Sequence, residues 1–383
     1  MVPFVRFGRG RERAAYGAVA VAVAAVMIGG GVVAQIGLRG RAGPAVAAEF
    51  RALVAPCEAT ALPTLGGRWG NATAASSNGL VVGIAEDASG RSRPVLWRAG
   101  RAVALEIALD AVVPTGVNRS GAVVGTGYDS AAEMLVGWWW SGGTMHRLPV
   151  EPDDIALPEA IDDSGRIVGA LIEDEEHSDG PGADENERAA LWVSTKTLPR
   201  ELPAAAGDDT AHAFAIAPDG TIGGVSMGRT AAGALWDLQG RVQRLPNLDD
   251  AAAGLVRGFD SQARPVGDAA AAGGGSRAVR WENGKPHDLG SPAPGRTSSG
   301  VAATADVVAG TGNVPVQGGG EVSQAVVWIR GIAYVLTPLS QPGFVAVAGA
   351  ATAVGTSAGA PIVVGYSADT VGARYPTVWR CPR

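Results

Sequence analysis

Residues that usually carry chemistry are scarce in this chain of 383 residues. It contains four His, scattered singly along the sequence, and two Cys, and none of them are paired at the spacing of metal ligands. Lys occurs only at Lys196 and Lys285, and such Arg-over-Lys, Ala-rich usage is typical of a GC-rich bacterial genome. The sequence therefore predicts neither a metal centre nor a catalytic motif, and it is most informative about architecture.

Positive charge is also scarce outside the N-terminal region. Residues 1–41 carry a net charge of +5, whereas the whole chain carries −6, which leaves −11 for residues 42–383. Binding to phosphates needs a basic face, so this acidic body argues against a nucleic-acid partner.

The N-terminal region has the features of an export signal. Ala14–Leu38 contains no charged residue and follows four Arg, and it is long enough to cross a hydrocarbon layer of ~30 Å. It is either a signal-anchor (1–13 cytoplasmic, 14–38 membrane-spanning, 39–56 linker) or a signal peptide cleaved near Ala34 or Ala47. Arg39 and Arg41 favour the anchor. Both interpretations predict an extracytoplasmic protein, membrane-anchored or secreted, that meets the membrane only through this helix.

The rest of the chain is a repeat. Each copy has a turn, an apolar run that ends in Val-Gly or a similar pair, a gap, and an apolar strand with Trp, and most copies then have a Leu, often followed by Pro. The first copy predicts four strands at 72–76, 80–85, 94–98 and 102–105. Seven four-stranded units predict an all-β, seven-bladed β-propeller over residues 57–383. The Trp series is Trp97, Trp140, Trp192, Trp236, Trp281, Trp328 and Trp379, preceded by Gly83, Gly125, Gly169, Gly224, Gly267, Gly310 and Gly365.

The two ends of this repeat array predict how the ring closes. The seventh copy ends soon after Trp379 without a fourth strand, and an extra strand at 60–65 precedes the first copy. We expect that N-terminal strand to complete the last blade. Cys57 and Cys381 fall where this composite blade lacks a covalent turn, so we predict a disulfide between them, which an exported compartment permits.

One pentapeptide imitates a catalytic motif. Gly355–Gly359 has the form Gly-x-Ser-x-Gly of a nucleophile elbow, which requires a strand-to-helix turn and a later His. No His follows Ser357, and the pentapeptide falls at the turn between the first two strands of its repeat. We therefore assign it no catalytic role. The scattered His residues are interpreted as solvated or capping groups.

The repeat resembles the bacterial extracellular HAF-repeat family, whose unit carries Asn-Asp-x-Gly-x-Val-Val-Gly followed by an Ala-Phe-Leu-Trp-like strand. The matching segments are 77–83, 162–169 and 189–192, and residues 62–67 resemble the family's Leu-Gly-Thr-Leu-Gly-Gly linker. The family's His is missing from the Trp strand of every copy, and His212-Ala213-Phe214 lies on the preceding strand. The resemblance implies a propeller-like fold and export, and it implies no activity.

Acidic residues gather in the loops that a propeller places on one face, namely the strand 2–3 loops and the blade-to-blade loops. We predict that this face binds an unknown protein or cell-envelope ligand, and the negative charge of the acids would suit a basic partner. Carboxylate oxygens would also suit Ca²⁺, but the sequence contains no calcium motif and no cofactor is predicted. The other interpretation is a solvated acidic loop. Trp69 is a candidate exposed contact. The candidate acids are Asp153, Asp154, Asp208, Asp209, Asp249, Asp250, Asp174, Glu175 and Glu176.

Two functions remain open from the sequence. The first is a non-catalytic binding or interaction module that uses this face. The second is an extracytoplasmic hydrolase or lyase whose carboxylates converge at the mouth of the propeller channel, where acids such as Asp153, Asp154, Asp208 and Asp209 would act.

Overall fold

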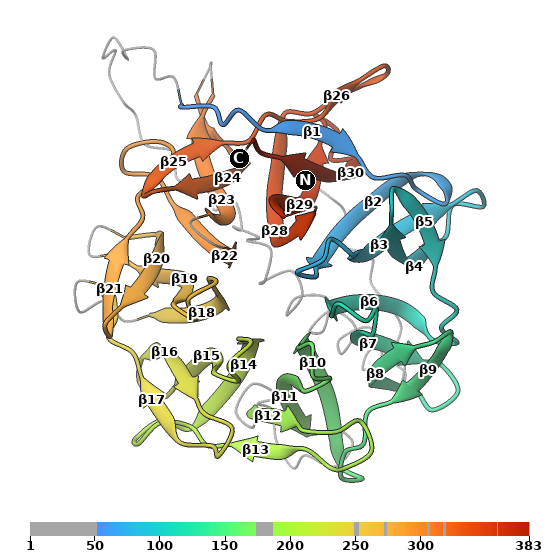
Figure 1. Cartoon of the computed structure of the whole chain (residues 1–383), viewed down its shortest axis with the longest axis vertical. Helices are drawn as coiled ribbons and strands as arrows, with labels where there is room; N and C mark the ends of the chain where they lie inside the picture. The colour runs from blue at the N-terminus through green and yellow to red at the C-terminus, as the bar shows by residue number, and fades with distance from the viewer. Residues whose placement is uncertain are drawn as a thin grey trace, which may run out of the picture.

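Each repeat folds into an antiparallel sheet whose four strands follow one another from the ring axis outward. The computed structural model describes residues 52–173, 187–248, 253–271, 274–304, 307–316, 319–357 and 359–382. Figure 1 shows seven such sheets around a common axis, which confirms the predicted all-β, seven-bladed propeller. The predicted N-terminal helix lies outside the described residues.

Blades 1 to 6 each take four consecutive strands. Blade 1 consists of β2 (Gly66–Ala75), β3 (Val81–Asp87), β4 (Ser92–Arg98) and β5 (Arg101–Ala104). Blade 2 consists of β6 (Asp110–Val117), β7 (Val123–Asp129), β8 (Met134–Ser141) and β9 (Thr144–Arg147). Blade 3 consists of β10 (Asp154–Ile161), β11 (Ile167–Glu173), β12 (Arg188–Trp192) and β13 (Arg200–Leu202).

The remaining blades follow the same order. Blade 4 consists of β14 (Thr210–Ile216), β15 (Ile222–Met227), β16 (Ala231–Trp236) and β17 (Val242–Arg244). Blade 5 consists of β18 (Gly254–Phe259), β19 (Pro265–Ala270), β20 (Ser276–Glu282) and β21 (Lys285–Asp288). Blade 6 consists of β22 (Ser298–Thr304), β23 (Val307–Pro315), β24 (Glu321–Ile329) and β25 (Ile332–Val335). Blade 7 consists of β28 (Ala348–Ser357), β29 (Ala360–Ala368), β30 (Arg374–Arg380) and β1 (Glu58–Ala61), and it follows the hairpin β26 (Ser340–Gln341) and β27 (Phe344–Val345).

The recurring Val-Gly of the sequence marks a β-bulge. In every blade the innermost strand has a register shift opposite the Gly of the second strand, as between Ala72 and Ala74 beside Gly83. A Cβ at any of these seven Gly would lie 1.9–2.2 Å from a backbone oxygen of the bulged strand. No side chain can occupy that space, so the bulge explains why Gly recurs there.

The recurring Trp joins neighbouring blades. In six blades its ring is fully buried and its indole N–H donates to the carbonyl of the residue after the recurring Leu of the preceding blade, as Trp236 does to Pro203 at 2.8 Å. The Leu residues of that series are buried as well. Trp and Leu therefore seal each interface by apolar packing, and a hydrogen bond fixes the two blades relative to each other.

Blade 2 departs from this pattern. Trp140 pairs with Val123 as Trp97 pairs with Val81, so its backbone occupies the position predicted from the sequence. The fully buried ring of this blade nevertheless belongs to Trp138, while Trp140 is only partly buried. Neither indole N–H has a hydrogen-bond partner within the described residues.

The N-terminal segment closes the ring, as predicted. β1 pairs with β30, with Ala59 opposite Trp379, and Cys57 and Cys381 form a disulfide. In the chain-entropy picture, a disulfide that closes a loop this long contributes up to about 5 kcal/mol. The predicted position of the closing strand was too far along the chain, because the strand ends at Ala61 and Leu65 already binds β3 of blade 1 through its bridge to Asp87.

The same segment also contacts blade 6. Val54 forms a parallel bridge with Val335, and the two flanking backbone hydrogen bonds join residues 53 and 55 to that edge of β25. The blue segment in Figure 1 therefore runs along the outer edges of two blades before it enters the first. This segment therefore links blades 6 and 7 to each other at the place where the two ends of the chain meet in the ring.

Candidate binding site in the central channel

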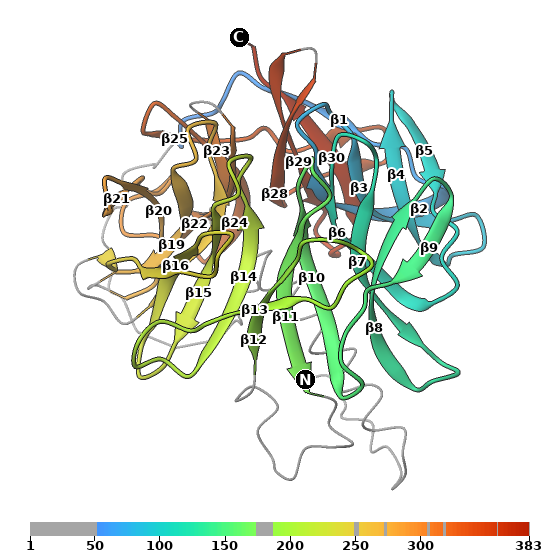
Figure 2. The ribbon, with the colours of Figure 1, turned by 60° about the horizontal axis from the view of Figure 1, so that its bottom comes forward.

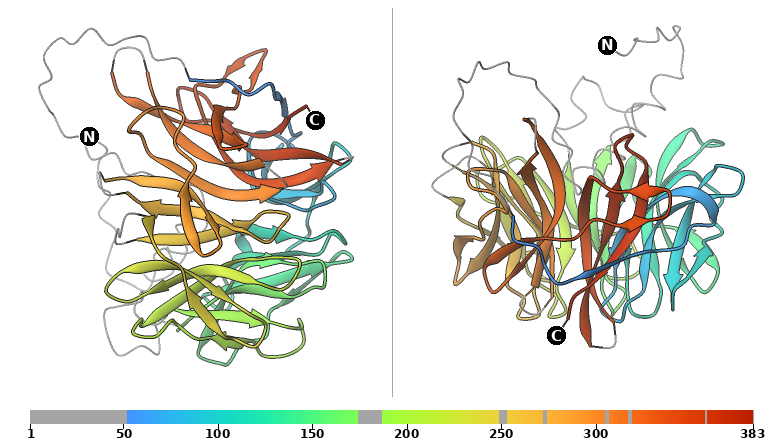
Figure 3. Two further views of the ribbon diagram at one scale, coloured as in Figure 1. Left: turned by 60° about the vertical axis from the view of Figure 1, so that its left-hand side comes forward. Right: turned by 90° about the horizontal axis from the view of Figure 1, so that it is seen from above.

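The strands that line the ring axis enclose a cavity of about 790 Å³. Most of its wall comes from the innermost strands of all seven blades, β2, β6, β10, β14, β18, β22 and β28, and β3, β4, β29 and β30 of blades 1 and 7 add single residues. The side views in Figures 2 and 3 show these strands running lengthwise through the disc. Each sheet pairs the start of its first strand with the end of its second, as Asp154 pairs with Glu173, so blade-to-blade and strand 2–3 loops share one face.

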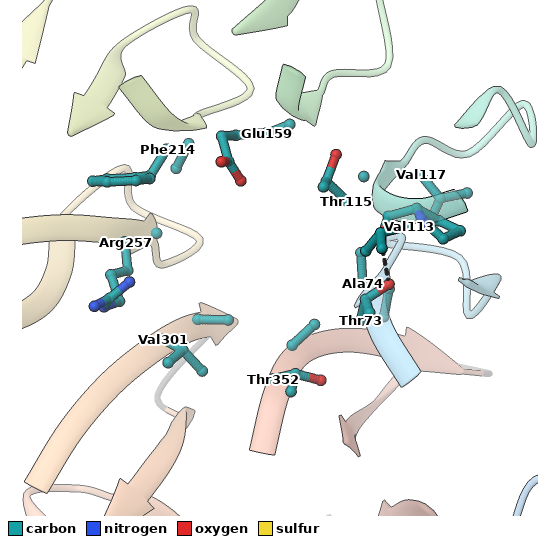
Figure 4. A pocket seen from close by; sticks show the side chains of 18 of the residues that line it. Thr73, Ala74, Val113, Thr115, Val117, Glu159, Phe214, Arg257, Val301 and Thr352 are labelled. Atoms are coloured by element: carbon teal, nitrogen blue, oxygen red, sulfur yellow. Dashed lines mark hydrogen bonds between the residues drawn. The ribbon is translucent and has the colours of Figure 1, made fainter. Parts of the chain in front are cut away.

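The seven bulges place one residue each at the same level of the channel. All seven line the cavity, and Figure 4 shows how they surround it. The residue that follows each bulge is Ala or Gly in every blade, and the next one is always apolar, as Ile161, Ile216 and Phe259 are. The channel therefore has one level of varied side chains above an apolar well. The seven residues are Thr73, Thr115, Glu159, Phe214, Arg257, Val301 and Thr352.

Three of these positions hold Thr, in consecutive blades 7, 1 and 2. Each hydroxyl donates to the carbonyl of the residue before the bulge in the next blade, and the distances are 2.6–2.7 Å. The donors are Thr352, Thr73 and Thr115, and the acceptors are Ala72, Pro114 and Pro158. The Thr side chains thus link the innermost strands of four blades through hydrogen bonds.

Blade 3 replaces the Thr with Glu159, which meets a buried His of blade 4. His212 has its Nε2 3.3 Å from Glu159 and its Nδ1 hydrogen-bonded to Glu187 at 2.6 Å. Burial disfavours protonation, but the hydrogen bonds and negative charges of the two Glu outweigh it and raise the pKa of His212 to about 9. At neutral pH the imidazole is therefore a cation shared by two carboxylates.

The polar cluster continues into blades 4 and 5. The ring of Phe214 stacks on His212 with centroids 4.3 Å apart, and the Arg257 guanidinium lies 5.9 Å from the Phe214 centroid. Arg257 donates to Asp268 at 2.8 Å, and Asp268 also accepts from Ser299 of blade 6 at 3.0 Å. Phe214 thus contacts two cations, each held by carboxylates. Figure 4 shows Glu159, Phe214 and Arg257 side by side on one wall of the cavity.

The opposite wall has an aromatic and basic border, with residues from blades 1 and 7. Trp69 lines the cavity from β2, and the Arg374 guanidinium lies 4.4 Å from the centroid of the Tyr366 ring. Extra register shifts occur here in β2, between Gly66 and Gly70, and in β6 near Ala111, which adopts a left-handed φ of 46°. Such irregularities redirect side chains, and these two help bring Trp69 and Ala111 to the cavity.

The predicted acidic residues divide into two groups where the structure describes them. Asp154 is buried and forms an ion pair with Arg188, and Asp208 lies 3.2 Å from Arg244 and accepts a hydrogen bond from Ser226. Asp153 and Asp209 are exposed. One acid of each pair therefore stabilises its blade, and only the other faces solvent.

Several other predicted features can be placed or set aside. Asp174, Glu175, Glu176, Asp249 and Asp250 lie outside the described residues. Ser357 ends β28 at the turn to β29, where the sequence placed it, and not at a strand-to-helix turn.

In the described part of the chain, no group of three or more His, Cys, Asp or Glu is arranged to hold a metal ion. No helix there is long and apolar enough to span a membrane.

The interpretation of the His residues as solvated was wrong for His212, which is buried and ion-paired. The sequence gave a partial signal, because Glu159 and His212 interrupt an otherwise Ala-, Thr- and Val-rich set of inner strands. Glu159, Phe214 and Arg257 were missed because a bulge places them at the same level of the channel. The alternation of apolar residues along a strand does not show which residue a bulge turns toward the axis.

Comparisons with known proteins support the fold and go no further. The β-propeller domain of the Trilobed protease from Pyrococcus furiosus aligns with a TM-score of 0.51 at 10% identity, over 82% of this chain and 93% of that one. That domain is described as having an open velcro topology, whereas β1 pairs with β30 here. YCF48 bound to D1 peptide aligns at 0.44 and 12% identity, over 87% and 98% of the two chains. TolB from Acinetobacter baumannii aligns at 0.40 and 14%, over 82% and 79%.

No protein-family model and no curated protein matches the chain. At these identities the structural matches establish a β-propeller and no function. The resemblance to HAF repeats stays a prediction from the residues.

Proposed function

We propose that this protein is an extracytoplasmic, non-catalytic binding module of the HAF-repeat type, which takes its ligand into the central channel from the face with the strand 2–3 and blade-to-blade loops. The observation that carries the proposal is the cavity of about 790 Å³, bordered by Trp69, Tyr366 and Arg374. Ligand sites are usually cavities of ~300–1,000 Å³ with apolar walls and a few placed polar groups. The export signal predicted from the sequence and the disulfide support this location.

The chemistry of the carboxylates favours binding over catalysis. A hydrolase or lyase at the channel mouth needs free carboxylates that approach a substrate together. Asp154 and Asp208 are both held by Arg side chains, and Glu159 is the one carboxylate among the described residues of the cavity wall. We therefore keep the enzyme as the second hypothesis.

Recovery of a partner from the cell envelope tests the proposal. The full-length protein is used as bait, and Trp69→Ala is compared with Trp139→Ala, a matched variant at a ring that stacks on His146 away from the cavity. We expect Trp69→Ala to lower partner recovery several-fold, because stacking on an aromatic ring at a binding site is lost. Equal recovery by wild type and both variants would contradict binding at the channel.

A second pair of variants tests the acidic face by itself. Asp153→Asn with Asp209→Asn removes two exposed charges and leaves the buried ion pairs of Asp154 and Asp208 in place. A basic partner would be recovered less well and with a weaker dependence on salt. Unchanged recovery would restrict the site to the channel.

A further inference from the structure

The wall formed by blades 3 and 4 carries one uncompensated negative charge. His212 is a cation at neutral pH, and it is shared between Glu159 and Glu187. Two carboxylates against one imidazolium leave a net charge of −1, and the neighbouring Arg257 is balanced by Asp268. Glu159 belongs to the cavity wall, so this negative charge faces the cavity and favours a cationic group there.

The opposite wall carries a positive charge without an acidic partner. Arg374 lies over Tyr366, and among the described residues no Asp or Glu forms an ion pair with it. A guanidinium that lies over an aromatic ring keeps N–H groups for a second partner, and its planar fork suits a carboxylate. Blades 3 and 7 lie on opposite sides of the ring (Figure 1), and Glu159 and Arg374 both line the cavity between them.

The space between these charges has the chemistry of a peptide site. The seven innermost strands are the inner edges of their sheets, and such edges can pair with the main chain of a peptide wherever their groups are not already bound to a neighbouring blade, as they are at the three Thr hydroxyls and at the N–H of Ala211. Below the charges lies the apolar well, whose wall includes Ile161, Ile216 and Phe259.

We propose that the channel binds a short peptide with free termini. Its ammonium group faces Glu159, its carboxylate faces Arg374, and an apolar side chain enters the well. This inference rests on the proposed function, because it names the class of ligand that the same cavity takes.

A pool of randomised tetrapeptides tests the inference. The pool with free termini is compared with an N-acetylated pool and a C-amidated pool, and the peptides retained by the full-length protein are measured by equilibrium filtration and mass spectrometry. A hydrogen-bonded charge pair changes affinity by roughly tenfold or more, so we expect the free pool to be retained at least about tenfold better than either capped pool.

Two variants assign the ends of the peptide. Glu159→Gln should remove the preference for a free ammonium and keep the preference for a free carboxylate, and Arg374→Gln should do the reverse. Glu151→Gln and Arg101→Gln, at exposed residues outside the cavity wall, are the matched controls and should retain both preferences. Arg374→Gln also decides the matter if loss of Glu159 weakens folding around His212, since Arg374 does not contact that cluster.

The outcomes separate this inference from the proposed function. Equal retention of the three pools, or no retention of any, would overturn the peptide inference. If partner recovery still fell with Trp69→Ala, the channel would remain the binding site for a ligand of another class. If Trp69→Ala left partner recovery unchanged while the pool with free termini was retained, the channel would be a peptide site and the partner would bind elsewhere on the protein.

Discussion

The two sides of the channel use the same bulge in different ways. On the side of blades 7, 1 and 2, the bulge residue is Thr, and its hydroxyl donates a hydrogen bond to a carbonyl of the next blade. On the side of blades 3, 4 and 5, the corresponding residues are Glu159, Phe214 and Arg257, which contact His212, Asp268 and each other. The backbone is the same on both sides, so the two sides differ only in which groups the bulge side chains bind.

This difference indicates where a function can reside. A Thr hydroxyl satisfies a neighbouring carbonyl and needs no other support. Buried charges lose hydration, and they are tolerated only where other charges and hydrogen bonds compensate for it. The charged side therefore requires Glu187, His212 and Asp268 merely to hold its wall together. Because these residues stabilise the ring less simply than Thr does, we place the ammonium end of the ligand on this side.

The largest expected effect should be equal on both sides. Gly83→Ala and Gly224→Ala each place a Cβ about 2 Å from a backbone oxygen, and the bulge must be undone to relieve the clash. We expect each variant to lower the free energy of unfolding by about 3 kcal/mol or more. Chemical denaturation measures it. Tolerance of Ala on only one side would break the equivalence of the two backbones.

A pH-dependent effect of similar size should occur on the charged side alone. The pKa of His212 is raised from 6.5 to about 9 in the folded protein, so its stabilisation is complete below about pH 6.5 and is lost as pH rises through 9. The stability difference between wild type and His212→Gln should shrink by about 3 kcal/mol over that range. Denaturation at several pH values measures the difference, and a constant value would contradict the ion-paired imidazolium.

A smaller effect should again be equal on both sides. Trp97→Phe and Trp236→Phe each remove an indole N–H bound to the preceding blade, at Pro63 and Pro203. We expect each to cost about 2 kcal/mol, from the unsatisfied carbonyl and the smaller ring. Trp140→Phe is the control, because its N–H has no partner in the described structure. Thermal and chemical unfolding compare the three, and an equal cost at Trp140 would show that packing alone matters.

The smallest effect should occur on the Thr side alone. Thr115→Val keeps the shape of the side chain but leaves the carbonyl of Pro158 without its donor, which should cost about 1 kcal/mol. Thr115→Ser keeps the hydroxyl and should cost less. Both variants should retain tetrapeptides as wild type does. A loss of retention would mean that Thr115 itself contacts the ligand.

Much of the fold could be predicted because it depends on repeated local patterns. Trp and Gly in a constant order defined each blade, and the positions of Cys57 and Cys381 relative to the recurring Leu and Trp defined the closure. The strand limits were less certain, and Leu65 belongs to blade 1 because its backbone pairs with β3. Trp138 is fully buried in place of Trp140, which packs partly buried against the same cluster, because a strand with three consecutive Trp offers two rings on the same face.

The candidate site could be predicted only in part. Trp69 was identified and lines the cavity, while Asp154 and Asp208 are occupied by Arg188 and Arg244, which no spacing in the sequence connects to them. Glu159 and His212 lie on different blades, so neither one predicts the other.

The number of blades, the interface Trp of six of them and the closure of the ring follow from the amino-acid sequence, because each depends on a pattern that recurs along the chain. Tertiary structure alone decided which side chains reach the axis and which charges meet there. A bulge turns one residue per blade toward the channel, and only the closed ring brings residues from separate repeats within the reach of a hydrogen bond.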